Sequence, residues 1–257
     1  MLGEKFKLPD FYGYDITTEN GIRRVNFLEG DFGEAVLNEY WQRARTKYSN
    51  LETLGGLQSS GGVIVRSNPL SAILINEILR PYNFRTATPA DLEIILEQKA
   101  LYLTHSYFDT SLVLRTQCDP NGYLSQHLVR QIKARDGKMV YPVMIPLVGL
   151  EFDDPNSEES RNSPIGMAFK LREDAEVIYA PQLSHDNHGE KFSRTDSKGL
   201  PIFSSDGTRV LHTLQFGLAR LYFCDGSNIK SDCESFVAAN EEGRVVVVSD
   251  ETAAQKG

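Results

Sequence analysis

Cysteine and tryptophan are scarce in this chain, which has three cysteines and one tryptophan among 257 residues. An odd, low cysteine count disfavours a disulfide-stapled extracellular module. Residues 1–9 do not have the pattern of a secretory signal. We therefore expect thiols in a reducing compartment, with the cytoplasm as the default location.

A net positive charge and long apolar runs are also lacking. The net charge is −8, which gives no electrostatic attraction to nucleic acid or to an anionic membrane. No apolar run has the length that spans a bilayer. We therefore expect neither a nucleic-acid partner nor membrane insertion. The hydrophobic fraction of 40% is ample for the core of one large domain or two small ones.

The familiar catalytic motifs are absent as well: we find no nucleophile elbow, phosphate loop or dinucleotide fingerprint. One polar cluster, residues 184–190 (SHDNHGE), has catalytic character, because His185 and His188 could share a divalent metal with Asp186 or Glu190 as a third ligand. The cluster is turn-like and lacks the helical frame of known two-histidine motifs. A solvated loop is the favoured interpretation, and we expect no metal and no cofactor.

Apolar periodicity predicts helices over residues 32–48, 69–79 and 123–134, and another that begins at Pro89 with Thr88 as its N-cap. Short strands are expected at residues 63–66, 84–87, 112–115, 209–213 and 244–248. We also expect a hairpin formed by residues 166–171 and 176–179, an edge or bent connection over 140–150, and an irregular arm over 1–30. Strands and helices do not alternate strictly, so the predicted class is α+β.

The stretch from Gly217 to Ser249 is the most informative one. Leu218, Leu221 and Tyr222 are expected to anchor a short helix or turn, and residues 244–248 to form a buried strand. Between them, residues 222–240 follow no helical or strand period and contain mostly Tyr, Cys, Asp, Gly, Ser, Asn and Ala; Ile229, Phe236 and Val237 are the expected core positions. Such a composition fits a surface connection or a contact surface of rigid tyrosines and small polar residues.

Two stretches resemble a known family. Residues 84–93 (FRTATPADLE) are similar to the Arg-Leu-Pro-Thr…Glu segment of C-type-lectin-fold proteins of the formylglycine-generating-enzyme kind. Residues 217–221 (GLARL), the mixed segment and residues 243–248 (GRVVVV) resemble the C-terminal variable region of diversity-generating-retroelement target proteins, in particular archaeal ones. The resemblance implies a C-type-lectin-like fold that holds a hypervariable ligand-binding surface.

The composition of the mixed segment fits this resemblance. In that family, mutagenesis strikes adenines, typically in asparagine codons, which gives Asn, Ser, Asp, Gly, Ala, Tyr, Cys, Phe, Val or Ile but never Lys, Glu, Gln, Met or Trp. Most of residues 222–240 belong to the accessible set. Lys230, Glu234, Glu241 and Glu242 lie outside it and would be invariant scaffold or positions that the mutagenesis does not target.

We therefore predict a non-enzymatic display protein. Residues 1–60 would form an accessory N-terminal arm and helix, and residues 61–257 a C-type-lectin-like domain with its variable region at about 217–248. The ligand is unnamed, and a protein is the expected class. Two alternatives stay open: a metal-dependent hydrolase that uses the loop at His185, and a structural assembly protein. The predicted ligand-binding residues are Tyr222, Cys224, Asp225, Gly226, Ser227, Asn228, Ser231, Asp232, Cys233, Ser235, Ala238 and Asn240.

Overall fold

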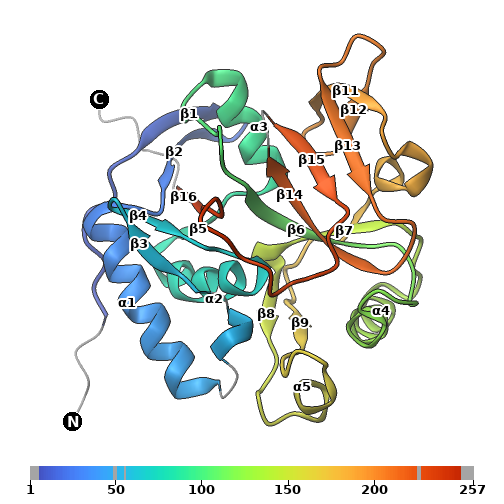
Figure 1. Ribbon diagram of the computed structural model, residues 1–257, viewed down its shortest axis with the longest axis horizontal. Helices are drawn as coiled ribbons and strands as arrows, with labels where there is room; N and C mark the ends of the chain where they lie inside the picture. Colours follow the sequence, from blue (N-terminus) through green and yellow to red (C-terminus); the bar gives the residue numbers. More distant parts are fainter. Residues whose placement is uncertain (1–5, 49–50, 55, 225–226, 250–257) are drawn as a thin grey trace.

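A curled eight-stranded sheet runs through the middle of the molecule (Figure 1). The computed structural model describes residues 6–48, 51–54, 56–224 and 227–249. Neighbouring strands are antiparallel except for the parallel pair of β13 and β15. In spatial order the strands are β10 (Ile178–Tyr179), β7 (Val143–Pro146), β6 (Phe108–Leu114), β14 (Leu218–Cys224), β15 (Asn228–Ser231), β13 (Arg209–Thr213), β11 (Lys191–Thr195) and β12 (Pro201–Phe203).

Strand β6 lies between β7 and β14 in this sheet, and all seven of its residues are buried. Successive side chains of a strand point to opposite faces. Leu112 and Leu114 accordingly join one hydrophobic cluster, whereas Val113 joins the other. The sheet therefore separates two cores, one lined by helices α1 (Gly30–Lys47), α2 (Pro69–Leu79) and α4 (Gly122–Asp136) and the other by α3 (Pro89–Gln98) and the N-terminal strands.

A second sheet joins the two ends of the chain. Its order is β1-β2-β16-β5, all antiparallel. The irregular arm predicted over residues 1–30 is wrong for Tyr14–Phe27, which forms a hairpin whose turn includes a 2.8 Å bond from Thr18 Oγ1 to Gly21 O. Residues on both sides of residue 60 thus share one sheet. Its strands are β1 (Tyr14–Thr18), β2 (Gly21–Phe27), β16 (Val246–Ser249) and β5 (Phe84–Thr86).

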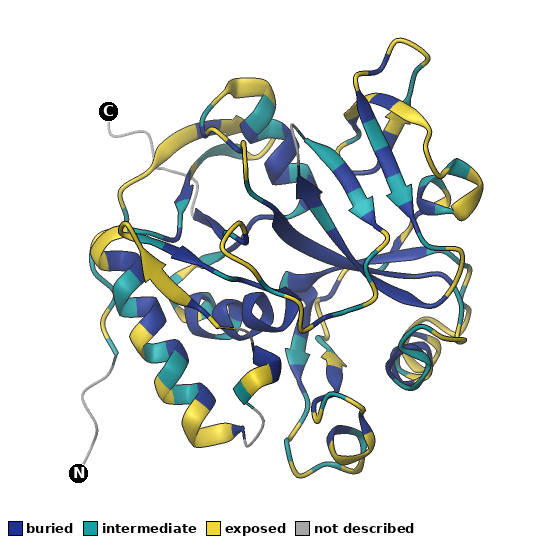
Figure 2. Ribbon diagram, in the orientation of Figure 1, coloured by how far each residue is buried: buried dark blue, intermediate teal, exposed yellow. Residues whose placement is uncertain are grey.

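The predicted helices are confirmed, and two of them begin at a capping side chain. The Thr88 side chain accepts from Asp91 N, and Asn68 caps the preceding helix in the same way through Ser71 N. Figure 2 shows the second helix as the most deeply buried, and Glu77 is its one residue outside the buried class. The helices are α1 (Gly30–Lys47), α2 (Pro69–Leu79), α3 (Pro89–Gln98), α4 (Gly122–Asp136) and the short α5 (Glu158–Asn162).

The hairpin predicted from residues 166–171 and 176–179 is wrong. Strand β9 pairs with β8, whereas β10 pairs with β7 of the large sheet. Between them Arg172 forms two bonds of 2.8 and 2.7 Å to Asp174 and donates its amide to Gly149 O, so the chain changes sheets at this point. The remaining strands are β3 (Gln58–Ser60), β4 (Val63–Val65), β8 (Leu150–Phe152) and β9 (Phe169–Leu171), and the 3₁₀ turns are η1 (Leu51–Leu54), η2 (Arg80–Tyr82), η3 (Leu147–Gly149), η4 (Pro181–Leu183) and η5 (His185–Asn187).

Within the residues that the structure describes, no helix combines the length and apolar character needed to cross a bilayer.

Candidate functional site

The segment that follows β15, residues 232–243, is called the C-terminal loop. It has no helix or strand of its own, yet other parts of the chain bind its carbonyl groups. The Arg220 amide donates to Cys233 O over 3.2 Å. Asn121 Nδ2 donates to Glu234 O over 2.7 Å, and Asn68 Nδ2 to Val237 O over 3.4 Å. These donors fix the path of the loop through its main chain.

Tyr107 holds the second half of the C-terminal loop. Its hydroxyl accepts from the Asn240 amide over 3.2 Å and donates to Ser67 O over 3.0 Å. Its own amide donates to Glu242 O over 3.1 Å. A Cβ atom at Gly243 would lie 2.6 Å from the Tyr107 hydroxyl and 2.8 Å from Ser67 O. Glycine is therefore required where the loop returns to the body.

One side chain of the C-terminal loop serves as its apolar anchor. Phe236 is 2% exposed and packs edge-on against Phe169, with ring centroids 5.7 Å apart. The neighbouring Val237, also expected in the core, is 38% exposed. Sequence reasoning thus identified one of the two apolar residues correctly.

A buried ion pair lies beneath the C-terminal loop. The Arg220 guanidinium binds both carboxylate oxygens of Asp109, with Nε to Oδ1 at 2.7 Å, and its Nη1 donates to Ala238 O over 2.9 Å. The side chains are 4% and 1% exposed. Burial alone would lower the pKa of Arg220, but the Asp109 carboxylate outweighs burial and keeps it above its ordinary value. Arg220 therefore stays charged, and the pair connects β14, β6 and the loop.

Two tyrosines flank this arginine. The guanidinium carbon lies 5.1 Å from the ring centroids of both Tyr107 and Tyr222, and the two rings meet edge to face at 5.8 Å. Burial, followed by the Asp232 carboxylate, raises the pKa of Tyr222 well above its ordinary value, and burial likewise raises that of Tyr107. Both phenols are neutral hydrogen-bonding groups at physiological pH.

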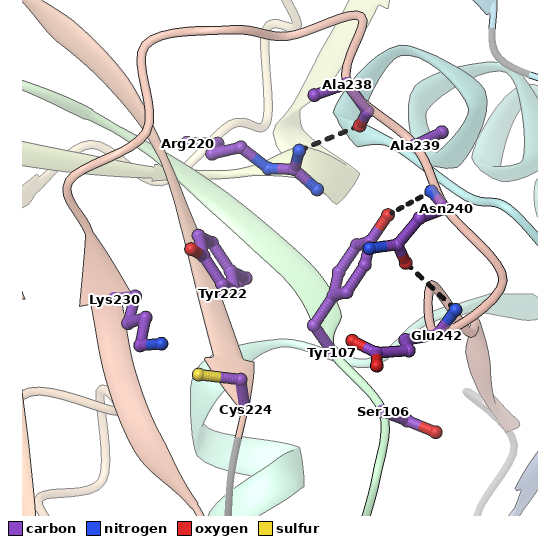
Figure 3. A pocket seen from close by; sticks show the side chains of 10 residues that line it. All are labelled: Ser106, Tyr107, Arg220, Tyr222, Cys224, Lys230, Ala238, Ala239, Asn240 and Glu242. Atoms are coloured by element: carbon purple, nitrogen blue, oxygen red, sulfur yellow. Dashed lines mark hydrogen bonds between the residues drawn. The ribbon is translucent and has the colours of Figure 1, made fainter.

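These residues border a pocket of about 290 Å³ (Figure 3). Strands β14 and β15 form one wall, and the second half of the C-terminal loop forms the other. Figure 3 shows the Tyr107 and Tyr222 rings between the two walls. The lining combines aromatic faces with amide, carboxylate and ammonium groups, which can pack against a ligand and form hydrogen bonds with it. Lining residues are Ser106, Tyr107, Arg220, Tyr222, Cys224, Lys230, Ala238, Ala239, Asn240 and Glu242.

The structure divides the predicted binding residues into two groups. Those on or beside the strands are partly or fully buried: Tyr222, Ser227 and Asn228 are half-buried, and Cys224 and Ser231 are 6% and 0% exposed. The expected exposure is wrong for Cys224 and Ser231. Asp225 and Gly226 lie outside the described residues. Within the C-terminal loop, Asp232, Ala238 and Asn240 are exposed, and Cys233 and Ser235 are half-buried.

Several of the strand residues have structural contacts. Ser231 Oγ accepts from Arg115 Nη2 over 3.1 Å, and Asn228 Oδ1 accepts from the Val210 amide over 2.8 Å. The helix or turn expected at 217–222 is corrected by β14. The lack of regular structure expected over 222–240 is confirmed for 232–240 and is wrong at 222–224 and 228–231, which belong to β14 and β15. Because β14 is buried on both faces, its sequence lacks the alternation that identifies a strand.

Sequence reasoning missed Tyr107, Asp109 and Asn68, which lie far from the loop in sequence. Arg220 carried a usable signal. It is a lone charge within the otherwise apolar residues 218–223, and such a charge requires a buried partner. Nothing in the sequence indicates that the partner is Asp109, because only the pairing of β14 with β6 in the folded protein brings the two residues together.

Residues 184–190, called the histidine loop, have a different arrangement from the one that a metal site needs. The described residues contain no group of three His, Cys, Asp or Glu side chains placed to hold a metal ion. The His188 ring lies 5.5 Å from that of His185 and 5.7 Å from that of His212. Its Nδ1 lies 3.0 Å from both the amide nitrogen and the carbonyl oxygen of Thr213, so the main chain of β13 already occupies this nitrogen.

Comparison with known proteins adds no relative: no family model, no curated protein and no solved structure matches this chain.

Proposed function

We propose that this protein is a ligand-binding display protein, and that its mixed α+β fold is of the C-type-lectin-like kind. The recognition surface is the C-terminal loop together with the pocket at Tyr222. The sequence resemblance to retroelement variable proteins supports the finer fold class and the expectation of a variable protein ligand. The arrangement of helices and antiparallel strands is compatible with the α+β class to which that fold belongs.

The observation that carries the proposal is the way the C-terminal loop is held. Its contacts to the body run mainly through its own carbonyl and amide groups, with donors supplied by Arg220, Asn121, Asn68 and Tyr107. A main-chain contact persists when the side chain at that position changes. The loop can therefore accept many side chains without losing its path, as a recognition surface on a rigid scaffold requires.

The proposal also reduces the set of residues expected to vary. Asp232, Ser235, Ala238 and Asn240 lie on the loop and are exposed or half-buried. Cys224 lines the pocket as a buried residue, and Ser231 bonds to Arg115 inside the body. Variation is expected to be tolerated well at the first four positions and poorly at Ser231.

A library experiment tests this function. Asp232, Ser235, Ala238 and Asn240 are randomised in the full chain, displayed on yeast and selected against a panel of unrelated proteins. The matched control library randomises four residues of the histidine loop, His185, Asp186, His188 and Glu190. We expect binders of distinct specificity, with near-natural melting temperatures, mainly from the first library. Equal yields, or unfolded variants in the first library alone, contradict the proposal.

The gene gives a second test. The proposal expects a near-copy of the segment that encodes residues 217–248, next to a reverse transcriptase gene and differing from it only at adenines. A complete source genome without such a copy contradicts the retroelement assignment, although the library experiment could still support a fixed binding surface.

A further inference from the structure

Strand β1 lies at one end of the four-stranded sheet, where β2 is its neighbour. Figure 1 shows it at the rim of the molecule, with α3 beside it. Its residues are exposed or half-buried, with the exception of Ile16. An outer strand has main-chain donors and acceptors that face away from its neighbour, and these can pair with a strand of another molecule. The partners of these groups therefore decide whether β1 is open to such pairing.

The main chain of Thr17 is already paired with a side chain from the end of α3. The Thr17 amide donates to Gln98 Oε1 over 2.9 Å, and Gln98 Nε2 donates to Thr17 O over 2.7 Å. These two bonds reproduce the pair that a neighbouring strand would form with this residue. Gln98 is itself exposed, so the contact supplies hydrogen bonds and little core packing. The Gln98 carboxamide thus takes the place of a missing strand.

The residues of β1 whose main chain faces outward follow from the ladder with β2. In an antiparallel ladder the direction of the main-chain groups alternates along the strand, so Asp15 faces outward as Thr17 does. Arg24, the partner of Asp15 on β2, agrees with this assignment, because its amide donates to Ser249 Oγ of β16 over 2.9 Å. The outward main-chain groups of β1 are therefore those of Asp15 and Thr17, and Gln98 closes the second of these residues.

A second copy of the chain has matching groups at the same edge. When two β1 strands run antiparallel about a twofold axis at Ile16, Asp15 of each copy lies opposite Thr17 of the other. Both residues face outward, so each of these pairs would exchange two hydrogen bonds. The Asp15 carboxylate then lies opposite a threonine and not opposite a like charge, which would oppose pairing. The edge is therefore self-complementary, and Gln98 occupies the Thr17 half of it.

The other edge of the same sheet is closed in a similar way. Asn76 Oδ1 of α2 accepts from the Thr86 amide of β5 over 2.8 Å, and Arg85 Nη1 donates to Thr86 O over 3.2 Å. The main chain of Thr86 faces away from β16, since the next amide, that of Ala87, donates to Val246 O. Side chains thus bind outward main-chain groups at both edges of this sheet.

We propose that β1 is a pairing surface for β1 of a second copy of this chain, and that Gln98 is an edge guard that holds this surface closed. An incoming strand has to displace both Gln98 bonds before it reaches the Thr17 main chain. The guard therefore weakens association through β1 by the free energy of those bonds. The proposal is independent of the display function, because none of its residues belongs to the C-terminal loop.

The test compares the natural full chain with Gln98→Ala by sedimentation equilibrium over a range of protein concentrations. The dissociation constant of the dimer should be lower in Gln98→Ala by about tenfold or more, because the incoming strand no longer displaces two hydrogen bonds. Hydrogen exchange locates the interface, since the Asp15 amide should gain protection as the concentration of Gln98→Ala rises. Gln98→Glu keeps an acceptor for the Thr17 amide but cannot donate to its carbonyl group, so its affinity should lie between the two.

The matched control is Gln42→Ala, which removes an exposed glutamine from α1 and should leave association unchanged. A second control adds Thr17→Pro to Gln98→Ala. Proline has no amide to donate and is tolerated where the strand faces outward, so the double variant should associate no more than the natural protein.

Three results overturn the proposal: equal association of the natural protein and Gln98→Ala, a dimer of Gln98→Ala that persists with Thr17→Pro, or an equal gain in Gln42→Ala. If Gln98→Ala does not fold, Gln98→Glu decides, and unchanged association of that variant counts against the guard.

Discussion

Strand β14 and the C-terminal loop both belong to the predicted variable region, but they are held in different ways: the strand mainly by its side chains and the loop mainly by its main chain. Six of the seven residues of β14 are buried, so the strand is held by its side chains. The C-terminal loop has Phe236 and Gly243 as its buried residues, and most of its other contacts run through its main chain, although the Glu241 carboxylate also contacts Gln58 and Arg66. A segment held by side chains constrains its own sequence, whereas one held by its main chain leaves that sequence free. The following variants test this difference, from the largest expected effect to the smallest.

The largest effect is expected for Arg220→Met. The substitution leaves the Asp109 carboxylate buried without its partner and removes the donor to Ala238 O. Breaking one side of a buried ion pair costs about 3–5 kcal/mol, measured as a loss of unfolding free energy in urea. The double variant Arg220→Met with Asp109→Leu should recover much of that loss. A loss below about 1 kcal/mol in the single variant, as for an exposed pair, would show that this pair does not anchor the scaffold.

Phe236→Ala is expected to cost about 3 kcal/mol, because it opens a cavity against Phe169. The matched control is the adjacent Val237→Ala, whose side chain is 38% exposed and which should change stability by less than about 0.5 kcal/mol. Chemical denaturation of the two variants measures the contrast. Similar losses in both would mean that the loop packs through a broad apolar face and not through one anchor.

Asn68→Ala removes the N-cap of α2 and the donor to Val237 O. We expect a loss of about 1–2 kcal/mol, together with faster amide hydrogen exchange in residues 236–240. Thr88→Ala is the matched control, since it removes the cap of α3, and the Thr88 side chain forms its hydrogen bonds with Asp91 and not with the loop among the described residues. Faster exchange in the loop of both variants would trace the effect to general destabilisation.

The smallest effect on stability is expected when four loop residues change together: Asp232→Ser, Ser235→Ala, Ala238→Ser and Asn240→Asp. Surface changes of this kind shift stability by less than about 0.5 kcal/mol each, and Asp at 240 keeps the acceptor for the Glu242 amide. Thermal melts should show little change, while a partner selected against the natural protein is lost. Ser231→Ala, which leaves Arg115 Nη2 without its acceptor, should cost more, about 1–3 kcal/mol. The reverse order would place the variable surface on the strands.

Local signals in the sequence identified the helices because each signal acts within one turn. Thr88, Pro89 and Asp91 start α3 by capping, and the apolar spacing of residues 69–79 matches α2. The buried strand near residues 244–248 was equally readable, since four consecutive valines have no polar face. The partners of β9 and β10 could not be predicted from the sequence. Arg172 and the turn at Asp174 look the same whether the two strands pair with each other or with different strands.

The sequence by itself determined the mixed α+β class, the main helices and the unusual composition of residues 222–240. Only the tertiary structure decided which of those residues face outward. Cys224 and Ser231 are small and polar or thiol-bearing like their neighbours, yet β14 and β15 bury them within the sheet. Exposure depends on strand register and on contacts with Tyr107, Asp109 and Asn68, all more than 100 residues away. Such long-range contacts have no signature in local composition, which is why only part of the candidate site could be predicted.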